Sequence, residues 1–568
     1  MPLKLIPNDE TSLTEGEKQV AQRLKKLYQS EDKEVYLYLT PRINKLEPDF
    51  LLIDPLRGVL VLETKNWSSH YLRHINPKEV VAIDGKKYHN PTFRTNQYFN
   101  TVKSLFSTDI TLMDEELELT FNLYAYVIFT SIKSEHIKNK ELFNQYPTSA
   151  IYEDEIKSLT LKKLFPKKEK NITALQVAVI RGIIFPEIQL QVEAHHEIDQ
   201  IIKTLDIEQE LFAKRVPVGH YLISGVPGSG KTVVLIARAI HLLKQNPSWK
   251  IAIVTYNKSL THKINRRLDA LNHSLYLNDI DLSKIEVSTF HKFALSVSKI
   301  KVPYKATQTF WEEELAEKAL QLVIATYDAI LVDEYQDFRN SWLKVCIASL
   351  KKHKDAKNEE QVNLFLAGDR LQSIYNPTAI NWNKDIGLDM RGRSKIFKQS
   401  YRAGKEHLEF SLKYLMTDSS LKSEVERFYD GSDAISSETE NKESLFFIEG
   451  QFEEVVKQIG ELLTKGYNFS DILILVNTWK EARRFYTYLP PYLKENAKVL
   501  KDVEDGIMNI TTYHSSKGLE NKIAMLLNID TIHEKKLLYV GTTRASEKIY
   551  LHSSSFKKGI GKMLMTLV

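Results

Sequence analysis

The spacing of apolar residues separates an N-terminal segment of mixed helix and strand signals from a longer segment in which strands and helices alternate. Within residues 1–135, apolar side chains at helical spacing predict a helix over residues 16–27 and another around 97–106. This pattern predicts a compact α/β unit. The β-rich runs of this unit lie at residues 50–53, 59–62 and 123–129.

From about residue 205 the pattern changes to short apolar runs, each followed by a helical segment. Such alternation is typical of parallel α/β sheets. The polar, acidic residues 430–444 predict an exposed loop, and residues 166–170 a solvated connection. Strands are expected at 221–224, 251–255, 329–332, 364–367 and 472–476. We expect an α/β unit over 1–135, a charged helical connector over 136–204, and two parallel-sheet domains over 205–395 and 396–568.

The composition favours a soluble globular protein. The chain has 568 residues, of which 43% are hydrophobic and 27% charged, which favours soluble globular domains over disorder or fibres. The single cysteine, Cys346, excludes an intramolecular disulfide and a multi-cysteine zinc site. No apolar run approaches the ~20 residues that cross a bilayer, so we expect a cytoplasmic protein without a membrane partner. The formal net charge of +5 permits a nucleic-acid partner without requiring one.

The most specific motif is Gly225-Val-Pro-Gly-Ser-Gly-Lys-Thr232, which follows an apolar strand and opens a helix. This is the context that a phosphate-binding P-loop requires. Gly225, Gly228 and Gly230 would let backbone N–H groups surround phosphates. Lys231 would then contact the β- and γ-phosphates of ATP, and the Thr232 hydroxyl would bind Mg²⁺.

Two carboxylates, Asp333 and Glu334, come directly after a second predicted strand. An acidic cluster at this place is usually a solvated turn, but beside a P-loop it has a chemical use. Asp333 can hold the metal ion, and Glu334 can orient and deprotonate the attacking water.

The residues Asp333-Glu-Tyr-Gln-Asp337 resemble motif II of the UvrD/Rep-like superfamily 1 helicases, and further motifs follow in that family's order. The resemblance implies two RecA-like motor domains that bind ATP between them. Motifs III and VI contain Gln372, which would couple the γ-phosphate to the strand-binding groove, and Arg544, the arginine finger. It further implies that Gln209 binds the adenine, Glu520 the ribose and Arg402 a phosphate.

The same resemblance implies contacts with a nucleic-acid strand. Thr255-Tyr-Asn-Lys258 is similar to motif Ia and Thr289-Phe-His291 to motif Ib. Trp382 is a candidate base-stacking residue or a tryptophan packed beneath motif III. The residues expected at the strand are Tyr256, Asn257, Thr289, Phe290, His291, Tyr375, Trp382 and His514.

The chain also departs from this family. The intervals from Lys231 to Asp333 and from Arg402 to His514 are each little more than a hundred residues. They are too short for the full accessory subdomains of larger relatives. The resemblance therefore supports strand-dependent ATP hydrolysis and translocation more strongly than duplex unwinding.

A second group of charged residues lies near the N-terminus. A hairpin over the 50–62 region that pairs Ile53 with Val59 would place Asp49 opposite Glu63. Opposing β-carbons are about 5 Å apart, so the two carboxylates could share one divalent ion. Lys65 projects from the same sheet face as Glu63. With Mg²⁺ this arrangement would suit cleavage of a phosphodiester.

This pattern resembles the restriction-endonuclease-like PD-(D/E)xK core, in particular the nuclease-related domain that often precedes such helicases. Glu17 matches the acidic residue of that domain's first helix, and Gln97 its later glutamine. The alternative is a set of surface charges beside a hairpin, or a fold that binds without cutting.

The preferred hypothesis is an ATP-driven motor on single-stranded or partly duplex DNA, coupled to a Mg²⁺-dependent nuclease, in DNA repair or defence against foreign DNA. One alternative is a motor whose N-terminal domain only grips nucleic acid. Another is the same chemistry on RNA. A P-loop switch without a nucleic-acid partner is disfavoured by the motifs after the P-loop.

Overall fold

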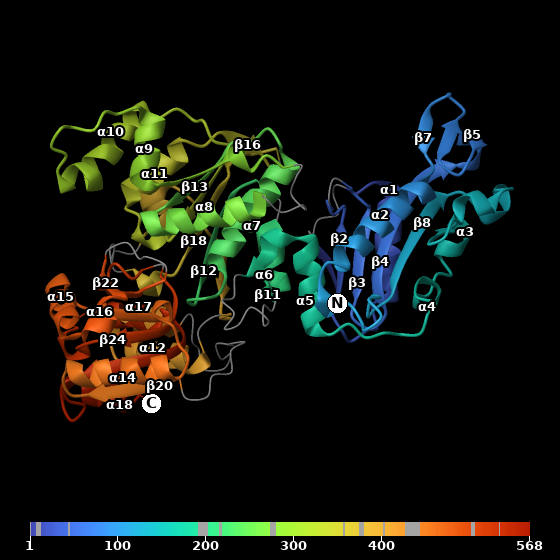
Figure 1. Ribbon diagram of the computed structural model, residues 1–568. Coiled ribbons are helices and arrows are strands. Elements are labelled where there is room, and N and C mark those ends of the chain that lie inside the picture. The colour runs from blue at the N-terminus through green and yellow to red at the C-terminus, as the bar shows by residue number, and fades with distance from the viewer. Residues whose placement is uncertain are drawn as a thin grey trace. The chain divides into compact units, whose positions relative to one another are not determined.

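The computed structural model divides the chain into two compact units (Figure 1). The first comprises Met1–Pro217, Ile236–Pro247 and Leu268–Leu282, and the second Val218–Leu235, Ser248–Arg267 and Ser283–Val568. The structure describes residues 2–6, 13–43, 46–190, 203–214, 218–272, 280–355, 358–373, 380–401, 404–426, 444–500, 506–517, 519–532 and 534–567.

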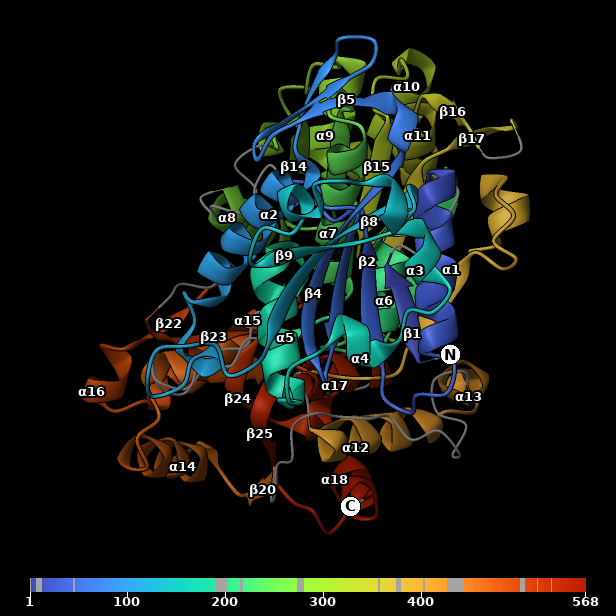
Figure 2. The same cartoon turned by 90° about the vertical axis from the view of Figure 1, so that its right-hand side faces the viewer.

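The first unit is built on a mixed six-stranded sheet in the order β1-β2-β3-β4-β8-β9. The pairs β2/β3 and β3/β4 are antiparallel, whereas β1/β2, β4/β8 and β8/β9 are parallel. Helices α1 (Glu15–Leu27) and α2 (Pro91–Phe106) flank the strands (Figure 2). The strands are β1 (Leu3–Ile6), β2 (Val35–Leu39), β3 (Phe50–Asp54), β4 (Gly58–Ser68), β8 (Leu123–Ser131) and β9 (Thr148–Ile151).

The predicted hairpin is confirmed, including its register. Strands β3 and β4 pair Ile53 with Val59 and Phe50 with Leu62. Asp49 precedes β3 by one residue and Glu63 follows the last pair, so both carboxylates lie at the same end of the hairpin. The two predicted helices are present as α1 and α2.

The sheet of the first unit continues beyond residue 135, where we had expected the domain to end. Strand β9 pairs in parallel with β8 and therefore completes one edge of the sheet. Helices α3 (Glu153–Ile156) and α4 (Leu161–Leu164) add Ile156 and Leu164 to the same core. The exposed residues 166–170 agree with the predicted solvated connection.

A three-stranded antiparallel sheet, which we call the wing, follows β4 and was not predicted. It consists of β5 (Leu72–Ile75), β6 (Glu79–Ala82) and β7 (Lys87–His89), in that order. The wing projects beyond the end of β4 in Figure 1.

Charged side chains of helices α5 (Ala174–Ile184) and α6 (Ile207–Lys214) are buried together next to β2 of this sheet. Glu210 accepts hydrogen bonds from Arg181, at 2.6 Å, and from Lys214, at 2.5 Å. The Tyr38 hydroxyl of β2 donates to Glu210 at 3.1 Å. Each cation therefore has a carboxylate partner, which offsets the cost of removing these charges from water. The strands here are β10 (Gln189–Leu190) and β11 (Lys203–Thr204).

The second unit contains two parallel six-stranded sheets, in the orders β14-β13-β15-β18-β12-β19 and β20-β25-β24-β21-β23-β22. The predicted α/β fold class is thus confirmed. Strand β19 (Ser394–Phe397) extends the first of these sheets across the expected boundary at residue 395. The other strands are β12 (His220–Gly225), β13 (Ile251–Thr255), β14 (Ile285–Thr289), β15 (Ala329–Asp333), β16 (Lys352–Lys354), β17 (Glu360–Val362), β18 (Leu364–Gly368), β20 (Leu445–Glu449), β21 (Ile472–Val476), β22 (Ala497–Val499), β23 (Met508–Thr512), β24 (Asn521–Leu526) and β25 (Ala545–Ser553).

Helices lie between most consecutive strands of these parallel sheets, as the alternation in the sequence predicted. None of the helices in the described ranges is both long and apolar enough to span a bilayer. The expected loop at 430–444 lies outside the described residues except for Ser444. The remaining helices are α7 (Lys231–Gln245), α8 (Lys258–Asn272), α9 (Phe290–Ser298), α10 (Leu315–Leu322), α11 (Asn340–Ala348), α12 (Lys405–Met416), α13 (Ser419–Glu426), α14 (Phe452–Thr464), α15 (Trp479–Tyr488), α16 (Pro491–Lys494), α17 (Lys535–Thr542) and α18 (Gly559–Met565).

Candidate functional sites

The P-loop connects β12 to α7, and its glycines are required by the backbone. Gly228 and Gly230 have φ angles of +73° and +77°, which side chains with a β-carbon rarely adopt. Gly225 has a different reason. A β-carbon there would lie 2.8 Å from the carbonyl oxygen of Phe397 in the neighbouring strand β19. The loop can therefore form only with glycine at these positions.

The two functional side chains of the P-loop face the end of the sheet. The Lys231 ammonium donates to the carbonyl oxygens of Gly225, at 2.9 Å, and Val226, at 3.0 Å. The Thr232 hydroxyl donates to Asp333 Oδ2 at 2.8 Å. A hydroxyl and a carboxylate at this spacing are the oxygen donors that Mg²⁺ prefers.

Asp333 lies at the end of β15 and is 1% exposed. Burial, followed by the charge of Glu334, raises the pKa of Asp333 to about 7, against the opposing effects of Thr232 and Lys231. Burial makes the ionised form of Asp333 unfavourable, and a bound cation would stabilise that form. Thr232 and Asp333 therefore fit the predicted magnesium site. Glu334 adopts a left-handed backbone (φ 56°) and accepts a hydrogen bond from the Gln336 amide.

Arg544 lies against residues of the other parallel sheet. Its Nη2 donates to Gln372 Oε1 at 3.0 Å, while its Nε donates to the Val540 carbonyl at 2.9 Å. Gln372 in turn donates to Asp369 Oδ2 at 3.1 Å, and the Tyr539 hydroxyl donates to the same oxygen at 3.1 Å. The predicted arginine finger and the predicted coupling glutamine are therefore in direct contact.

This contact brings Arg544 toward the P-loop. Asp369 is buried, and burial raises its pKa while the charge of Lys231 lowers it. The charge of Lys231 therefore acts on Asp369, and Arg544 is linked to Asp369 through Gln372. Arg544 follows helix α17 and Gln372 follows β18, so residues far apart in the sequence meet here.

Lys517 forms a further contact that the motif pattern did not assign to a role. This side chain is 3% exposed and donates to the Gln372 carbonyl at 2.6 Å. Its ammonium also lies 2.6 Å from Asp337 and 4.0 Å from Glu334. In the sequence, the signal for Lys517 is its position within the segment from His514 to Glu520, which contains other predicted site residues.

The other predicted nucleotide-binding residues have varied surroundings. Gln209 lies on α6 in the first unit and is fully buried, and its backbone N–H donates to Asp206 Oδ1 at 2.8 Å. Glu520 accepts a hydrogen bond from the Lys263 ammonium of α8 at 2.8 Å. Arg402 lies outside the described residues, as does Tyr375 of the predicted strand contacts.

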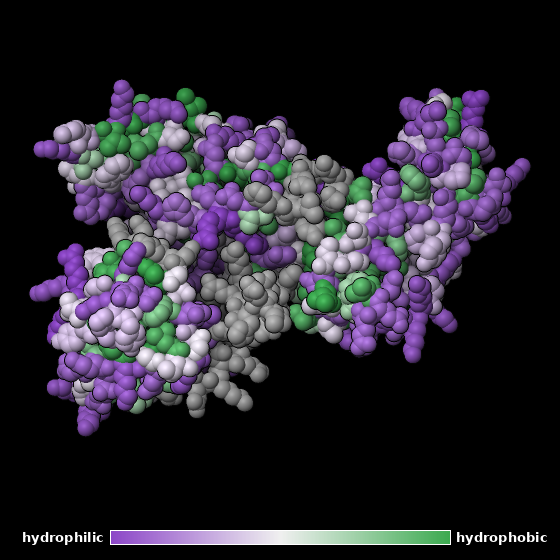
Figure 3. Space-filling model, in the orientation of Figure 1, coloured by the Kyte–Doolittle hydropathy of each residue, from purple (hydrophilic) through white to green (hydrophobic). Residues whose placement is uncertain are grey.

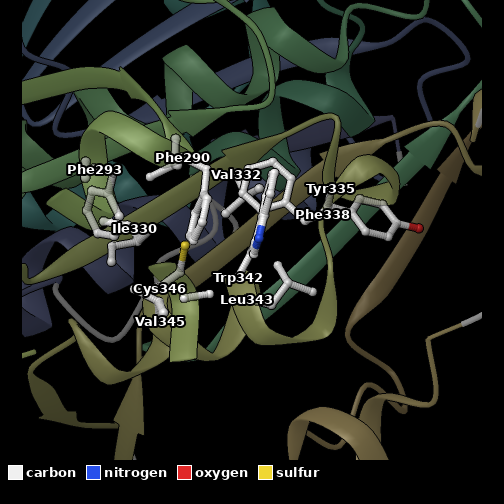
Figure 4. Close-up of a cluster of buried hydrophobic side chains, with 14 of the residues drawn as sticks. Phe290, Phe293, Ile330, Val332, Tyr335, Phe338, Trp342, Leu343, Val345 and Cys346 are labelled. Carbon is white, nitrogen blue, oxygen red and sulfur yellow. The ribbon is translucent and has the colours of Figure 1, made fainter. Parts of the chain in front are cut away.

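The aromatic residues expected at the nucleic-acid strand are partly core residues, as Figure 4 shows. Phe290 is fully buried, and its ring stacks on Trp342 at 4.3 Å and 8°. This corrects the expectation for Phe290, because a base cannot stack on a ring that the core already covers. Tyr256 is half-buried and lies over Trp342 at 6.1 Å, and His291 packs edge-on to the same ring at 4.8 Å.

Most of the other residues expected to contact the nucleic-acid strand lie at the ends of helices or β-strands. Asn257 Oδ1 accepts from the Leu260 N–H at 2.8 Å and so caps the start of α8. Thr289 is the residue before α9, and His514 lies in the turn after β23. Trp382 is half-buried, and its ring is 5.7 Å from Tyr335, which agrees with the alternative of a tryptophan packed beneath motif III.

In the first unit, Asp49, Glu63 and Lys65 form one cluster. Asp49 Oδ2 accepts from the Thr64 N–H at 2.5 Å, and Lys65 Nζ lies 2.5 Å from Glu63 Oε1. Glu63 is 5% exposed, and its second oxygen, Oε2, is buried without a hydrogen-bond partner. A buried carboxylate oxygen with no partner is costly, so this oxygen is available to a cation.

The charges of the neighbouring residues act on Asp49. Burial, then the charge of Glu63, raises the pKa of Asp49 to about 7, while Lys65 and the Thr64 N–H lower it. Glu17 contributes a smaller increase, which places it near the cluster. Its carboxylate also accepts from the Thr14 N–H at 2.8 Å and caps α1.

Helix α2 contributes two residues that sequence reasoning missed. Arg94 Nε donates to the Tyr98 hydroxyl at 2.9 Å. Burial, then the charge of Glu63, raises the pKa of Tyr98 to about 12, and the charge of Glu63 also acts on Arg94. Gln97 lies on the same helix but is exposed. The charge of Glu63 therefore acts on both Arg94 and Tyr98 of α2.

Asp49 and Glu63 would hold a single divalent ion, to which Glu63 Oε2, buried without a hydrogen-bond partner, is available. Within the described ranges no group of three or more His, Cys, Asp or Glu side chains is arranged to hold a metal. A site with only two carboxylate ligands would suit Mg²⁺, which usually keeps several waters.

Two protein-family models match the chain. The nuclease-related domain matches residues 12–130, and the UvrD/REP helicase N-terminal domain matches residues 205–305 and 301–377. A curated relative described as "ATP-dependent DNA helicase Rep", from Buchnera aphidicola subsp. Baizongia pistaciae (strain Bp), is 25% identical over 206 residues. That alignment covers 35% of this chain and 29% of the relative, so the chain spans less than a third of the relative's length.

The chain is also similar to a solved structure titled "The structure of PRRSV helicase", with 13% identity and a TM-score of 0.29. The alignment covers 61% of this chain and 54% of that chain, and a score this low does not establish a common fold. The family matches, by contrast, coincide with the two resemblances predicted from the motifs. Residues 12–130 are thus similar to the nuclease-related domain, and residues 205–377 to the N-terminal domain of UvrD/REP helicases.

Proposed function

We propose that this protein is an ATP-driven motor that moves along single-stranded DNA and presents the strand to a Mg²⁺-dependent nuclease. The observation that carries the motor is the hydrogen-bonded set of Asp369, Gln372 and Arg544, which joins the sheet of the P-loop to the opposite sheet. Processing of this kind suits DNA repair or defence against foreign DNA.

In the motor, the P-loop N–H groups and Lys231 bind the phosphates of ATP, and Thr232 and Asp333 would hold Mg²⁺, which neutralises phosphate charge. Glu334 orients the attacking water and accepts its proton. Arg544, positioned by Gln372, stabilises the charge that develops on the γ-phosphate. Since Gln372 also contacts Lys517 of the second sheet, loss of the γ-phosphate alters contacts between the sheets.

In the nuclease, Asp49 and Glu63 would hold a divalent ion, which polarises the phosphodiester and its attacking water. Lys65 lies beside Glu63 and is partly exposed, so its ammonium can contact the phosphate or the nucleophile. Arg94 adds a second positive charge on the side of α2. The cluster therefore offers two cations to a bound phosphate.

The motor is tested by Lys231→Ala. We expect DNA-stimulated ATP hydrolysis to fall to background, because no other P-loop side chain supplies the ammonium. Lys465→Ala, at an exposed position after α14, is the control and should hydrolyse ATP at the parent rate. Hydrolysis by Lys231→Ala at the parent rate would refute the assignment.

The nuclease is tested with end-labelled single- and double-stranded DNA, with and without ATP and Mg²⁺. Glu63→Gln and Lys65→Ala should each abolish Mg²⁺-dependent cleavage while ATP hydrolysis is retained. Glu79→Gln, on the wing, is the matched control and should cut like the parent. Equal cleavage by Glu63→Gln and the parent would show that this cluster is not the site.

A second candidate is an N-terminal domain that binds nucleic acid without cutting. The Lys65–Glu63 ion pair favours it, because the lysine already neutralises one of the two carboxylates. In that case the parent binds labelled strands but leaves them intact at every Mg²⁺ concentration. Comparing ATPase stimulation by DNA and RNA oligomers of one sequence distinguishes the two polymers.

A further inference from the structure

Three aromatic rings meet at the base of the wing, next to the nuclease cluster. The ring of Trp67 lies 5.6 Å from that of Tyr88 and 6.4 Å from that of Tyr71. The Tyr71 and Tyr88 rings are 6.3 Å apart, and their hydroxyls are hydrogen-bonded at 2.8 Å. All three side chains are half-buried, so part of each ring reaches the surface.

This aromatic cluster lies on the same face of the sheet as the nuclease residues. In the β4–β8 pairing, Glu63 is opposite Val127 and Lys65 is opposite Phe129, and paired residues share a face. Trp67 packs against the core cluster that contains Val127 and Phe129. The face that carries Glu63 and Lys65 therefore continues into the aromatic cluster along β4.

The wing base is fixed to the rest of the unit. Asn90 is fully buried, and its amide nitrogen donates to the carbonyls of Asn76 and Leu142, both at 2.9 Å. Its side-chain oxygen accepts from the Thr92 N–H at 3.0 Å and caps α2. One side chain thus ties the β5–β6 turn, α2 and the segment after β8 together, so the rings are held in place relative to Glu63.

The surface of the wing is positively charged and polar. Hydrophilic residues cover most of it in Figure 3, at the upper right. Asp84 and Glu79 pair with Lys86 at 3.2 Å and Lys87 at 3.3 Å, respectively. Lys and Arg nevertheless outnumber Asp and Glu by four to two across residues 69–90, and three histidines are added. The exposed basic residues are Arg73, Lys78, Lys86 and Lys87.

We infer that the cluster of Trp67, Tyr71 and Tyr88 is a stacking platform for an unpaired base next to the phosphate held at Lys65. The inference rests on the proposed nuclease and names its substrate as a single-stranded segment. Aromatic rings in a basic surface bind single strands because every base offers a π-face. A base inside a duplex has both faces covered by its neighbours, so it cannot use this platform.

The first test is photocrosslinking with the full-length protein. A single-stranded oligomer carrying 5-iodouracil is irradiated in EDTA without ATP, so that nothing is cut, and the crosslinked peptides are identified. We expect a crosslink within residues 67–88 in addition to those in the motor, and its loss in Trp67→Ala. Crosslinks confined to the second unit would overturn the inference, whether or not the protein is a nuclease.

The second test is the rate of Mg²⁺-dependent cutting. Because stacking of one base contributes to binding, we expect Trp67→Ala to cut single strands about tenfold more slowly than the parent, or slower still. Trp67→Phe keeps an aromatic ring and should cut at nearly the parent rate. Tyr146→Ala, an exposed aromatic of the same unit, is the control. An abasic nucleotide beside the cut should slow the parent by a similar factor without slowing Trp67→Ala further.

Two results would contradict the platform while leaving the nuclease intact. One is a parent that cuts duplex DNA as fast as single strands, and the other is an abasic effect that is equal in the parent and Trp67→Ala. Tyr88→Ala provides the same comparison if Trp67→Ala unfolds at a lower temperature than the parent. Failure of the parent to cut any strand refutes the nuclease and leaves crosslinking to decide the platform.

Discussion

Asp49 and Asp333 are the two carboxyl groups at the centres of the candidate sites, and both have a pKa raised to about 7. In each case burial is the main cause and a neighbouring glutamate the second. Each group therefore destabilises the folded protein when it ionises without a cation. This strain at single residues is what a bound metal ion would relieve.

The first prediction concerns Asp49→Asn in EDTA. The folded pKa of about 7 exceeds the ordinary value of 3.8, so the folded state binds more protons between these values and loses stability as pH rises through this window. We expect the variant to melt at least about 3 °C above the parent at pH 8 and close to it at pH 4. Thermal unfolding at both pH values, with and without Mg²⁺, makes the measurement, and Mg²⁺ should reduce the difference at pH 8.

A second residue-scale prediction concerns Arg94 and Gln97 on α2. Because Arg94 interacts with Glu63 and Tyr98 whereas Gln97 is exposed, we expect Arg94→Ala to slow DNA cleavage by about tenfold or more, the effect of a charge-assisted contact. Gln97→Ala should remain near the parent, and both should hydrolyse ATP normally. A larger loss for Gln97→Ala than for Arg94→Ala would reverse the assignment.

At the scale of elements, strands β12 and β19 approach each other so closely at the start of the P-loop that position 225 accommodates only glycine. Strands β12 and β19 are parallel neighbours, with Gly225 opposite Phe397. The missing β-carbon at Gly225 lets the chain turn toward α7 at this contact. The same parallel sheet places Asp333, at the end of the nearby β15, beside Thr232.

The third prediction is that Gly225→Ala weakens both the fold and nucleotide binding. Its β-carbon would meet Phe397 O at 2.8 Å and Phe397 Cβ at 2.9 Å, so the strands must separate, at a cost of about 1–3 kcal/mol. Gly460→Ala in α14 is the control, because a β-carbon there meets only Tyr492 Oη at 3.9 Å and should stabilise the helix. Melting temperature and ATP binding compare them, and equal behaviour would contradict the prediction.

At the scale of the whole molecule, residues distant in sequence connect the two parallel sheets of the second unit. Arg544 contacts Gln372, and Lys517 contacts Gln372 and Asp337. These buried contacts join the segment after β18 to those around β23 and α17. In the proposed motor, these contacts would couple ATP hydrolysis to movement of the sheets, because each contact has partners on both sides.

The fourth prediction is that Arg544→Ala and Gln372→Ala are not additive. If Gln372 acts by positioning Arg544, each variant should lower the maximal ATPase rate at least about tenfold, and the double variant little further. ATP binding should be retained in all three, since Lys231 is unchanged. Losses that multiply in the double variant would show that the two residues act independently.

The sequence by itself determined the features that depend on local pattern. Helix α1, five strands of the two parallel sheets, the P-loop and the β3–β4 register follow from neighbouring residues, because period and turn chemistry act over a few positions. The family resemblances followed from the same short motifs, and the matched models agree with them. Predictions at the ends of domains were weaker, as β9 beyond residue 135 shows.

Only the tertiary structure decided which distant side chains meet. It covered the ring of Phe290 with Trp342, joined Arg544 to Gln372, and placed Trp67 beside Tyr88 at the base of the wing. No local period encodes these partners, because burial and charge pairing depend on elements that are dozens of residues apart. The physical reason is that an apolar or charged face can pack against many different partners, and only the complete fold determines which partner it meets. A turn or a helix, by contrast, depends mainly on its own residues.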